Sequence, residues 1–524
     1  MTGYKKIVIR SYISTAGCRC FLGAMLCLLA LNGCSRNHNN AEMATPDDLR
    51  KAVVTDNLHD GNDLAVARVA VMTGSTSELF MSKKYPDAEL LLFDDINDAF
   101  MAVKAGKADY VFTSFTTSLL AAKNIPGLVV LPKKYTDDAA GIAFNKKDTV
   151  LLRQINEIVL RYKEDGTLDD LIARWIKLDG SDYQPPKDVK TPAAKQGKPL
   201  RVGIAANREP MCFISNGKIA GLDAELIERI AYEANRPVEY MDMKFSSLIA
   251  ALESGKVDLV ISNLTATEER RQRVNFSESY FLNPQVLTTN TASASYVQKH
   301  WLSGIKDSFY NNLIVEKRYM MIVNGLKQTT IITFFSILFG TMIGGLICFL
   351  RMRRNRLSVS FAKMYISVMR GTPILVMLMI FFYVIFASSG LSASVVAIVT
   401  FALNMGAYSS EMFRTAIEGV DTGQSEAGAA MGFTKVQTFI YVVFPQAIRT
   451  VIPVYKGECI SLLKMTSVVG YIAVVDLTKA SDIIRSRTFD AFFPLIVVAV
   501  VYFLLAWLLG IALDTLNKKI TASK

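Results

Sequence analysis

Histidine and cysteine, which often perform catalysis or bind metals, are scarce in this 524-residue chain. It has three histidines, too few for most acid–base schemes. Of its seven cysteines, four lie at or before Cys34, and Cys212, Cys348 and Cys459 are far apart. This spacing excludes a disulfide framework and a metal site. The sequence also has no G-x-x-x-x-G-K-[ST] phosphate loop. We therefore expect no catalytic residues, no metal and no cofactor in this chain, which is not an enzyme.

Nucleic-acid binding is also not expected, although the formal net charge is +11. Much of the positive excess lies beside long apolar segments, where positively charged loops of membrane proteins are found. No zinc-ligand spacing, RNA-binding aromatic motif or long basic arm is present. The charge therefore indicates a lipid membrane rather than a nucleic acid.

The N-terminus has the three parts of an export signal: basic residues, the apolar stretch "FLGAMLCLLAL", and "LNGC" ending at Cys34. The last part resembles the lipobox of bacterial lipoproteins, with Asn32 an unusual residue inside it. The resemblance implies a lipoprotein-type signal peptide over 1–34 and lipidation of Cys34. The alternative is an uncleaved anchor with an unmodified Cys34. In both cases the segment that follows lies outside the cytoplasm.

The C-terminal part, 320–524, contains five apolar segments that predict membrane crossings, since a crossing helix takes roughly 20 residues. The segment "RMRRNRLSVSFAKMYISVMR" after the first crossing and the terminal "NKK" should stay cytoplasmic. We expect a multi-pass protein of the bacterial inner membrane, with its N-terminal domain outside and its C-terminus inside. The loop 476–489 does not fit this charge rule, because it carries Lys479, Arg485 and Arg487.

The stretch 423–453, "GQSEAGAAMGFTKVQTFIYVVFPQAIRTVIP", is too polar at its start to cross a membrane and helical in composition. It resembles the cytoplasmic EAA loop of permeases of ATP-binding-cassette (ABC) importers. "RGTP" (370–373), "AYSSEMFR" (407–414) and "ISLLKMTS" (460–467) resemble the polar-amino-acid, histidine/glutamine-type branch of that family. The family pattern assigns contact with the ATPase to Glu426, Ala427, Ala430 and Gly432. Small residues there allow close approach, and Gly432 permits a sharp chain reversal.

This resemblance implies two kinds of partner. Because the chain has no phosphate loop, ATP must be used by a separate ABC ATPase subunit. Because a transport pathway needs two permease domains, the resemblance also implies a homodimer of permease domains.

The exported part alternates short apolar strands with amphipathic helices, as α/β domains do. A linker rich in Pro and Lys at 181–199 divides it. The half at 200–290, beginning "LRVGIAANREP", resembles the first lobe of family 3 extracytoplasmic amino-acid-binding proteins. The half at 46–180 resembles the second lobe, together with the segment that returns to the first lobe. We thus expect an α/β two-lobed periplasmic-binding-protein-like domain, a connector at 291–319, and an all-α permease domain of about five helices.

The two lobes stand in reversed order, and one unit is repeated: "AVKAGKADYVFTSF" at 102–115 and "ALESGKVDLVISNL" at 251–264. We interpret this as a circularly permuted binding domain, because chain termini of domains are commonly close together at the surface. Two truncated binding domains, or lobe exchange between neighbouring molecules, would give the same sequence.

The polar loops after the repeated units predict the ligand site. In "SNLTATEER" the resemblance assigns the α-carboxylate of an amino acid to Arg270, helped by Thr265 and by backbone N–H groups near Asn263 and Ser262. An Arg fork suits a carboxylate because it donates two parallel bonds. The resemblance also places an aromatic ligand cover at Phe245, which could equally be a core residue of its lobe.

In the other half, "GSTSE" (74–78) resembles the family's turn at a helix start, with Thr76 as its binding residue. Ser114 stands where many members have an Asp that pairs with the α-ammonium. Arg208 stands where an aromatic commonly stacks on the ligand; it would favour an acidic ligand or point to solvent.

Together these features predict an amino acid ABC transporter subunit that combines substrate binding and permease. The substrate expected is a polar amino acid, glutamine or glutamate. The alternative is a ligand-sensing membrane receptor or a ligand-gated channel with the same lobes.

Overall fold

The computed structural model describes Leu64 and residues 67–176, 197–291, 305–387, 389–490 and 492–522. The expected signal peptide, Cys34, His38 and His59, and most of the linker at 181–199 lie outside the described residues.

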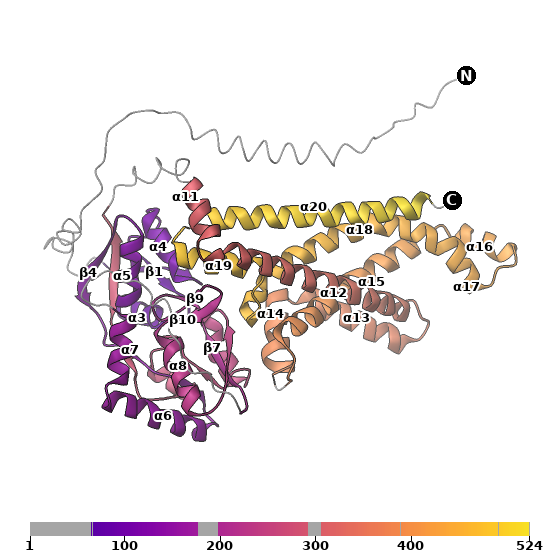
Figure 1. Ribbon diagram of the computed structural model, residues 1–524. Helices are drawn as coiled ribbons and strands as arrows, with labels where there is room; N and C mark the ends of the chain where they lie inside the picture. The colour runs from indigo at the N-terminus through magenta and orange to yellow at the C-terminus, as the bar shows by residue number, and fades with distance from the viewer. Residues whose placement is uncertain are drawn as a thin grey trace, which may run out of the picture. The chain divides into compact units, whose positions relative to one another are not determined.

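The first lobe met along the chain, lobe A, is built on a five-stranded sheet in the order β2-β1-β3-β15-β4. β1 pairs in parallel with β2 and β3, whereas β15 is antiparallel to β3 and β4. Its central strands are apolar runs because both faces of a parallel sheet are covered. The elements, in indigo and magenta in Figure 1, are β1 (Arg68–Met72), α3 (Thr76–Lys84), β2 (Glu89–Phe93), α4 (Ile96–Lys104), β3 (Tyr110–Ser114), α5 (Phe115–Asn124), β4 (Leu128–Lys134) and β15 (Gln285–Asn290).

The other lobe, lobe B, has a five-stranded sheet in the order β11-β7-β12-β6-β13. β7 is parallel to β11 and β12, and β6 is antiparallel to β12 and β13. Its elements are β6 (Ala143–Asn145), α6 (Thr149–Glu164), α7 (Thr167–Trp175), β7 (Leu200–Ile204), α8 (Leu222–Glu233), β11 (Val238–Asp242), η2 (Phe245–Ser247), α9 (Leu248–Glu253), β12 (Leu259–Val260), α10 (Glu268–Arg273) and β13 (Val274–Phe276). A small antiparallel sheet of β8 (Asn207–Arg208), β9 (Cys212–Ser215) and β10 (Lys218–Ala220) adjoins it.

Each lobe contains strands from both sides of the linker. β6 comes from the segment before the linker but pairs with β12 and β13 of lobe B. β15 comes from the segment after it but pairs with β3 and β4 of lobe A. The antiparallel pair of β5 (Ala139–Ala140) and β14 (Phe281–Leu282) lies where the two exchanged segments cross. The halves at 46–180 and 200–290 therefore each contribute to both lobes, because strand pairing is decided by neighbours distant in the chain.

The repeated unit is one structural device used twice. In lobe A, Arg68 pairs with Asp109, with its Nη2 2.7 Å from Oδ1. In lobe B, Arg201 pairs with Asp258 at 2.6 Å in the same way. Each carboxylate also accepts the backbone N–H of its arginine, so it fastens the start of β3 or β12 to the neighbouring strand.

The helical half has four helices long and apolar enough to cross a membrane among the described residues: 319–351, 393–418, 435–472 and 493–515. A fifth crossing would be the pair 356–371 and 374–385, which is bent by 108°. This agrees with about five expected crossings. The elements are α11 (Ile305–Phe309), η4 (Tyr310–Ile314), η5 (Val315–Lys317), α12 (Tyr319–Arg351), α13 (Arg356–Gly371), α14 (Ile374–Ile380), η6 (Phe381–Ile385), α15 (Ala393–Glu418), α16 (Thr422–Ala430), α17 (Lys435–Thr438), η7 (Phe439–Val443), α18 (Phe444–Met465), η8 (Thr466–Ile472), α19 (Leu477–Thr488) and α20 (Phe493–Ala522).

Small residues bring α12 and α15 together. A Cβ on Gly344 would lie 2.6 Å from the Cβ of Ser409, and one on Gly406 would lie 2.6 Å from the Cγ2 of Ile343. Apolar burial drives helix association weakly in lipid, so close backbone contact through small residues is the usual means of packing.

Candidate functional site

A small, nearly filled pocket lies between the lobes. Six of the eight predicted ligand residues line it: Thr76, Arg208, Phe245, Asn263, Thr265 and Arg270. The remaining lining residues are Met72, Ser75, Ser77, Thr113, Asn283 and Gln285. The structure therefore brings together residues as distant in the sequence as Met72 and Gln285.

Arg270 extends from α10 across the cleft. Its Nη1 donates to the carbonyl of Thr265 and its Nη2 to the carbonyl of Gly74 in lobe A, both at 2.9 Å. Burial, with the nearby positive charge of Arg208, lowers the pKa of Arg270 to about 10, so it is protonated at neutral pH. Its remaining donors are available to an anion in the pocket.

Arg208 and Arg270 lie on one aromatic ring. The guanidinium carbon of Arg208 is 5.0 Å from the ring centroid of Phe245, and that of Arg270 is 5.7 Å away. Phe245 lines the pocket and also belongs to a buried apolar cluster that includes residues of both lobes. Arg208 does not point to solvent: it is 7% exposed, its Nη1 donates to the carbonyl of Ser262 at 3.2 Å, and its Nε has no partner among the described residues.

Asp223 supports the cleft floor at the start of α8. It accepts hydrogen bonds from the hydroxyl of Tyr280 at 2.7 Å and from the backbone N–H of Asn263 at 2.8 Å. Burial raises its pKa to about 7. Because Asn263 has a φ of 45°, this bond holds a backbone conformation that is uncommon outside glycine.

The lobe A side of the pocket is a chain of polar groups. The Oγ1 of Thr76, at the first turn of α3, donates to Asp138 at 3.0 Å. The Nε2 of Gln285 donates to the same Asp138 oxygen at 2.7 Å, and its Oε1 accepts from Ser77 at 2.6 Å. Asp138 thus places a carboxylate directly behind Thr76 and Gln285, which line the pocket.

Two predicted ligand residues lie just behind the lining. The hydroxyl of Ser114 is buried and 2.9 Å from that of Thr117, while its neighbour Thr113 faces the pocket. The hydroxyl of Ser262 accepts the backbone N–H of Ala205 at 3.2 Å. Alternation along β3 explains the position of Ser114, since adjacent side chains of a strand point to opposite faces.

Sequence reasoning missed Asp138, Gln285 and Asn283. Asp138 follows Asp137 immediately before the crossing strand β5, and this pair of acids was the available signal. Gln285 had no signal, because its place in lobe A depends on β15 crossing from the other side of the linker.

The lobes touch around the cleft. Besides the bond from Arg270 to Gly74, the side-chain amide of Asn207 in lobe B donates to Asp95 in lobe A at 2.6 Å. Lys83 of α3 pairs with Glu269 of α10. The structure is therefore a closed arrangement of the two lobes.

A second candidate site is the predicted EAA segment. α16 carries Glu426, Ala427 and Ala430, all exposed, and Gly432 reverses the chain with a φ of +84°. Gly428 is the buried residue of α16, and a Cβ there would lie 2.7 Å from the Cγ2 of Thr438. An alanine at position 428 would therefore clash with Thr438, and glycine avoids this clash.

Large apolar side chains surround the turn after α16. Met431 is 74% exposed, and Val436 and Tyr441 are each 67% exposed. Exposed apolar groups gathered around a short helix are typical of a docking surface.

Comparison with known proteins matches parts of this chain. The family model for bacterial extracellular solute-binding proteins, family 3, matches residues 200–444. A Rickettsia bellii protein named as a glutamine transport system permease, GlnP, is 33% identical over 208 residues, which is 39% of this chain and 95% of that protein. The L-cystine transport system permease protein TcyB of Bacillus subtilis is 32% identical, over 40% of this chain and 90% of its own length.

A solved structure described as an amino acid ABC transporter with histidines is 30% identical. The match covers 42% of this chain and 98% of that chain, with a TM-score of 0.37.

Proposed function

Because this chain belongs to the amino-acid permeases of ABC transporters, joined to a solute-binding domain of family 3, we propose that it captures and imports an acidic amino acid. Named relatives transport different substrates, glutamine in one and cystine in another, so the substrate must be argued from the cleft. Between glutamine and glutamate, the charges in the cleft favour glutamate.

The observation that carries this proposal is the pair of arginines on Phe245. Arg270 receives the α-carboxylate and Arg208, with its free Nε, receives the side-chain carboxylate. Asp138, together with Thr76, receives the ammonium in place of the expected carboxylate at Ser114. Glutamine would leave one buried guanidinium without an anion, which is costly.

In this proposal the lobes lie outside the membrane and the C-terminus inside, as the charge asymmetry supports. The chain contributes no ATP chemistry. A separate ATPase uses ATP and binds at α16 and the exposed apolar residues beside it, and two copies of the chain form the pathway. α16 then transmits the motion of the ATPase to the membrane helices.

Isothermal titration of the purified full-length protein in nanodiscs tests the substrate. We expect L-glutamate to bind more tightly than L-glutamine. Arg208→Gln should weaken glutamate binding by about 10- to 100-fold, the loss of one charge-assisted contact, and change glutamine binding less.

Arg161→Gln, an exposed arginine on the outer face of lobe B, is the matched control and should leave both affinities unchanged. Arg208→Lys keeps the charge and should retain part of the preference, which separates a ligand role from a folding defect. Tighter binding of glutamine than glutamate to the wild type would contradict the proposal.

A further inference from the structure

The basic residues Lys479, Arg485 and Arg487, which do not fit the charge rule for membrane loops, lie on α19. In the structure each of them is paired with an acidic residue of the binding lobes. These ion pairs explain the three charges, which the membrane topology does not.

Two of the three basic residues, Lys479 and Arg487, pair with carboxylates of lobe B. The Nζ of Lys479 is 3.3 Å from Asp242, and the two side chains are 5% and 8% exposed. Arg487 pairs with Glu209 and, at 3.1 Å, with Glu316. Burial alone would lower the pKa of Arg487, but its two carboxylate partners raise it above the ordinary value. Buried charges of this kind are tolerated only while their partners stay in place.

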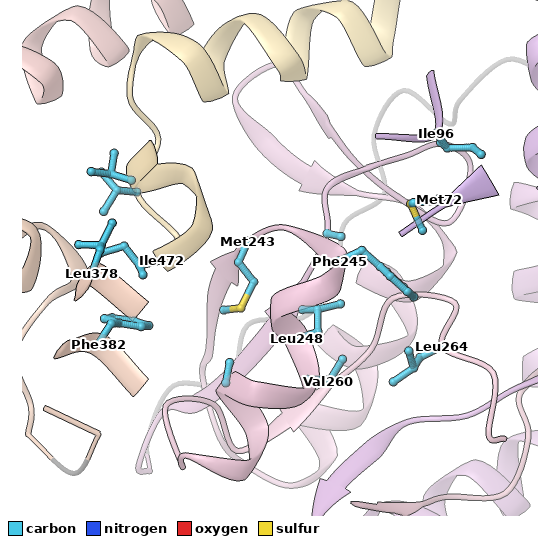
Figure 2. Packing of buried hydrophobic residues seen from close by; sticks show 14 of the residues in the cluster. Met72, Ile96, Met243, Phe245, Leu248, Val260, Leu264, Leu378, Phe382 and Ile472 are labelled. Carbon is cyan, nitrogen blue, oxygen red and sulfur yellow. The ribbon is translucent and has the colours of Figure 1, made fainter. Parts of the chain in front are cut away.

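Lobe B is also held by apolar contacts. Figure 2 shows Met243 of lobe B on the side of Leu378 and Phe382 of the membrane half, and these three residues belong with Leu248 to one buried cluster. Lys256, from the repeated unit, lies over the ring of Phe382 at 4.7 Å and donates to the carbonyl of Phe386. Lobe B is therefore packed against the permease as well as paired with it.

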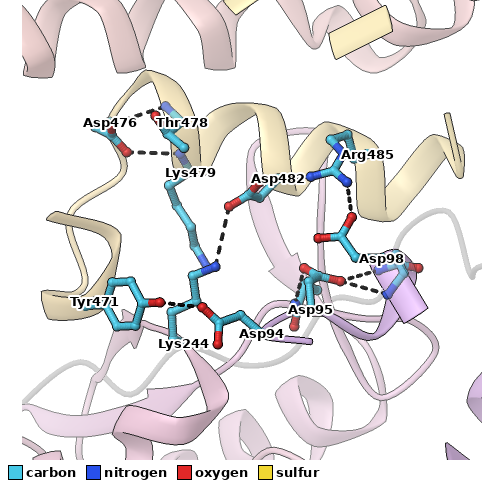
Figure 3. A network of polar contacts seen from close by, with 12 residues as sticks. Asp94, Asp95, Asp98, Lys244, Tyr471, Asp476, Thr478, Lys479, Asp482 and Arg485 are labelled. Atoms are coloured by element: carbon cyan, nitrogen blue, oxygen red, sulfur yellow. Dashed lines mark hydrogen bonds and ion pairs between the residues drawn. The ribbon is translucent and has the colours of Figure 1, made fainter. Parts of the chain in front are cut away.

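Lobe A meets the same region through polar side chains at the start of α4. Asp98 pairs with Arg485, and Asp94 accepts a hydrogen bond from the hydroxyl of Tyr471 (Figure 3). The side chain of Asp98 is 35% exposed, much more than the carboxylates that hold lobe B. The Asp98–Arg485 pair is thus less buried than the Lys479–Asp242 pair of lobe B and separates at a lower desolvation cost.

The start of α4 is also where lobe A touches lobe B. Asp95, between Asp94 and Asp98, caps α4 through the N–H of Asn97 at 2.9 Å and accepts from Asn207 of lobe B at 2.6 Å. If the lobes part while lobe B stays packed on the permease, α4 moves away from Asn207 and from Arg485 at the same time. The contact with α19 is thus complete only when the cleft is closed.

We propose that the Asp98–Arg485 pair and the Asp94–Tyr471 bond form a latch by which the permease recognises the closed cleft of its own chain, while lobe B stays anchored. The latch rests on the proposed function, since closure is driven by the captured amino acid. Its partner surface is α19 of the same polypeptide.

A cross-linking experiment tests the latch without the ATPase. In full-length protein carrying Asp98→Cys and Arg485→Cys, oxidation with copper phenanthroline should give several-fold more intramolecular cross-link with saturating L-glutamate than without it. The single variant Asp98→Cys controls for the native cysteines. If titration shows no glutamate binding, the proposed function fails; if glutamate binds but the cross-link yield does not change, the latch fails.

A charge exchange tests its effect on transport. Asp98→Lys should lower glutamate-stimulated ATP hydrolysis of the assembled transporter by about tenfold. The affinity for glutamate should change by less than about twofold, and Asp98→Lys combined with Arg485→Asp should recover the stimulation. Asp87→Lys, an exposed carboxylate of lobe A, is the matched control. Equal effects of Asp87→Lys and Asp98→Lys, or no recovery in the double variant, would overturn the latch.

Discussion

Asp223 and Asp258 are two carboxylates of lobe B with opposite electrostatic settings. Asp223 is fully buried, and burial raises its pKa to about 7 in spite of bonds from Tyr280 and Asn263. For Asp258, burial is outweighed by its bonds to Arg201, so its pKa falls below the ordinary value. Burial disfavours the charged form of Asp223, whereas the bonds from Arg201 favour the charged form of Asp258.

This difference predicts how stability changes with pH. A raised pKa means that the folded state holds the proton of Asp223 more tightly than the unfolded state. The stabilisation is complete below the unfolded pKa and is lost as pH rises through about 7. Asp223→Asn removes this loss, so the melting temperature of the variant relative to wild type should rise between pH 5 and pH 8.

Asp258→Asn is the control for that measurement. Asp258 is ionised in both folded and unfolded protein throughout this range, so its variant should be destabilised equally at both pH values. Calorimetry of the full-length protein provides the comparison. A pH-independent difference for Asp223→Asn would contradict the assigned burial.

At the scale of single elements, α16 contains a glycine, Gly428, that allows close contact with a neighbouring side chain rather than backbone flexibility. Gly428 lies against Thr438, and its Cβ would be 2.7 Å from Cγ2 and 2.9 Å from Oγ1 of that threonine. α17 starts with a capping box formed by Thr434 and Gln437, which fixes where Thr438 stands. The neighbour therefore has little freedom to move aside.

Gly428→Ala should consequently separate α16 from the chain that follows it and destabilise the segment by about 1–3 kcal/mol. We expect lower ATP hydrolysis by the assembled transporter, measured as glutamate-stimulated phosphate release. Adding Thr438→Ala removes both clashing atoms and should restore activity. Gly457→Ala, a helical glycine of α18 with no atom within 4 Å of the added Cβ, should be neutral. Failure of Thr438→Ala to rescue would contradict this packing.

At the scale of the whole molecule, the binding domain is one body made of interleaved segments. β6 enters the sheet of lobe B from before the linker, and β15 enters the sheet of lobe A from after it. This favours a permuted domain over two truncated binding domains. Separate truncated domains would not need strands from each other.

Cleavage at a protease site placed within 181–199 tests this arrangement. The N-terminal fragment should remain with the membrane fragment on size-exclusion chromatography in detergent, because β6 and β15 pair across the cut. The cut protein should also keep its affinity for glutamate. Elution of the N-terminal fragment by itself would contradict the interleaving.

The pattern of residues close together in the sequence was sufficient to predict many of the helices and strands of this protein. Apolar length predicted the crossing helices, and small residues with a glycine reversal predicted a short helix in the EAA segment, found as α16. The repeated units predicted equivalent strands, while the resemblance of their polar loops to family 3 binding proteins led to Arg270, Asn263 and Thr265 in the pocket. The helices and strands depend on residues within a few positions of one another, where composition and periodicity act directly.

Tertiary structure decided the rest. Gln285 reaches Ser77 only because β15 crosses into lobe A, and Ser114 turns behind the pocket because of its place in the alternation of β3. Arg485 and Asp98 are 387 positions apart, so no local pattern could join them. The sequence by itself determined the helices, the strands and the kind of site. The pairing of distant strands determined the lobes, and the pairing of buried charges determined the partners of Arg208 and the contact with α19. That division follows from physics: propensity and hydrophobic period are local, whereas the burial of a charge depends on whatever the whole fold places opposite it.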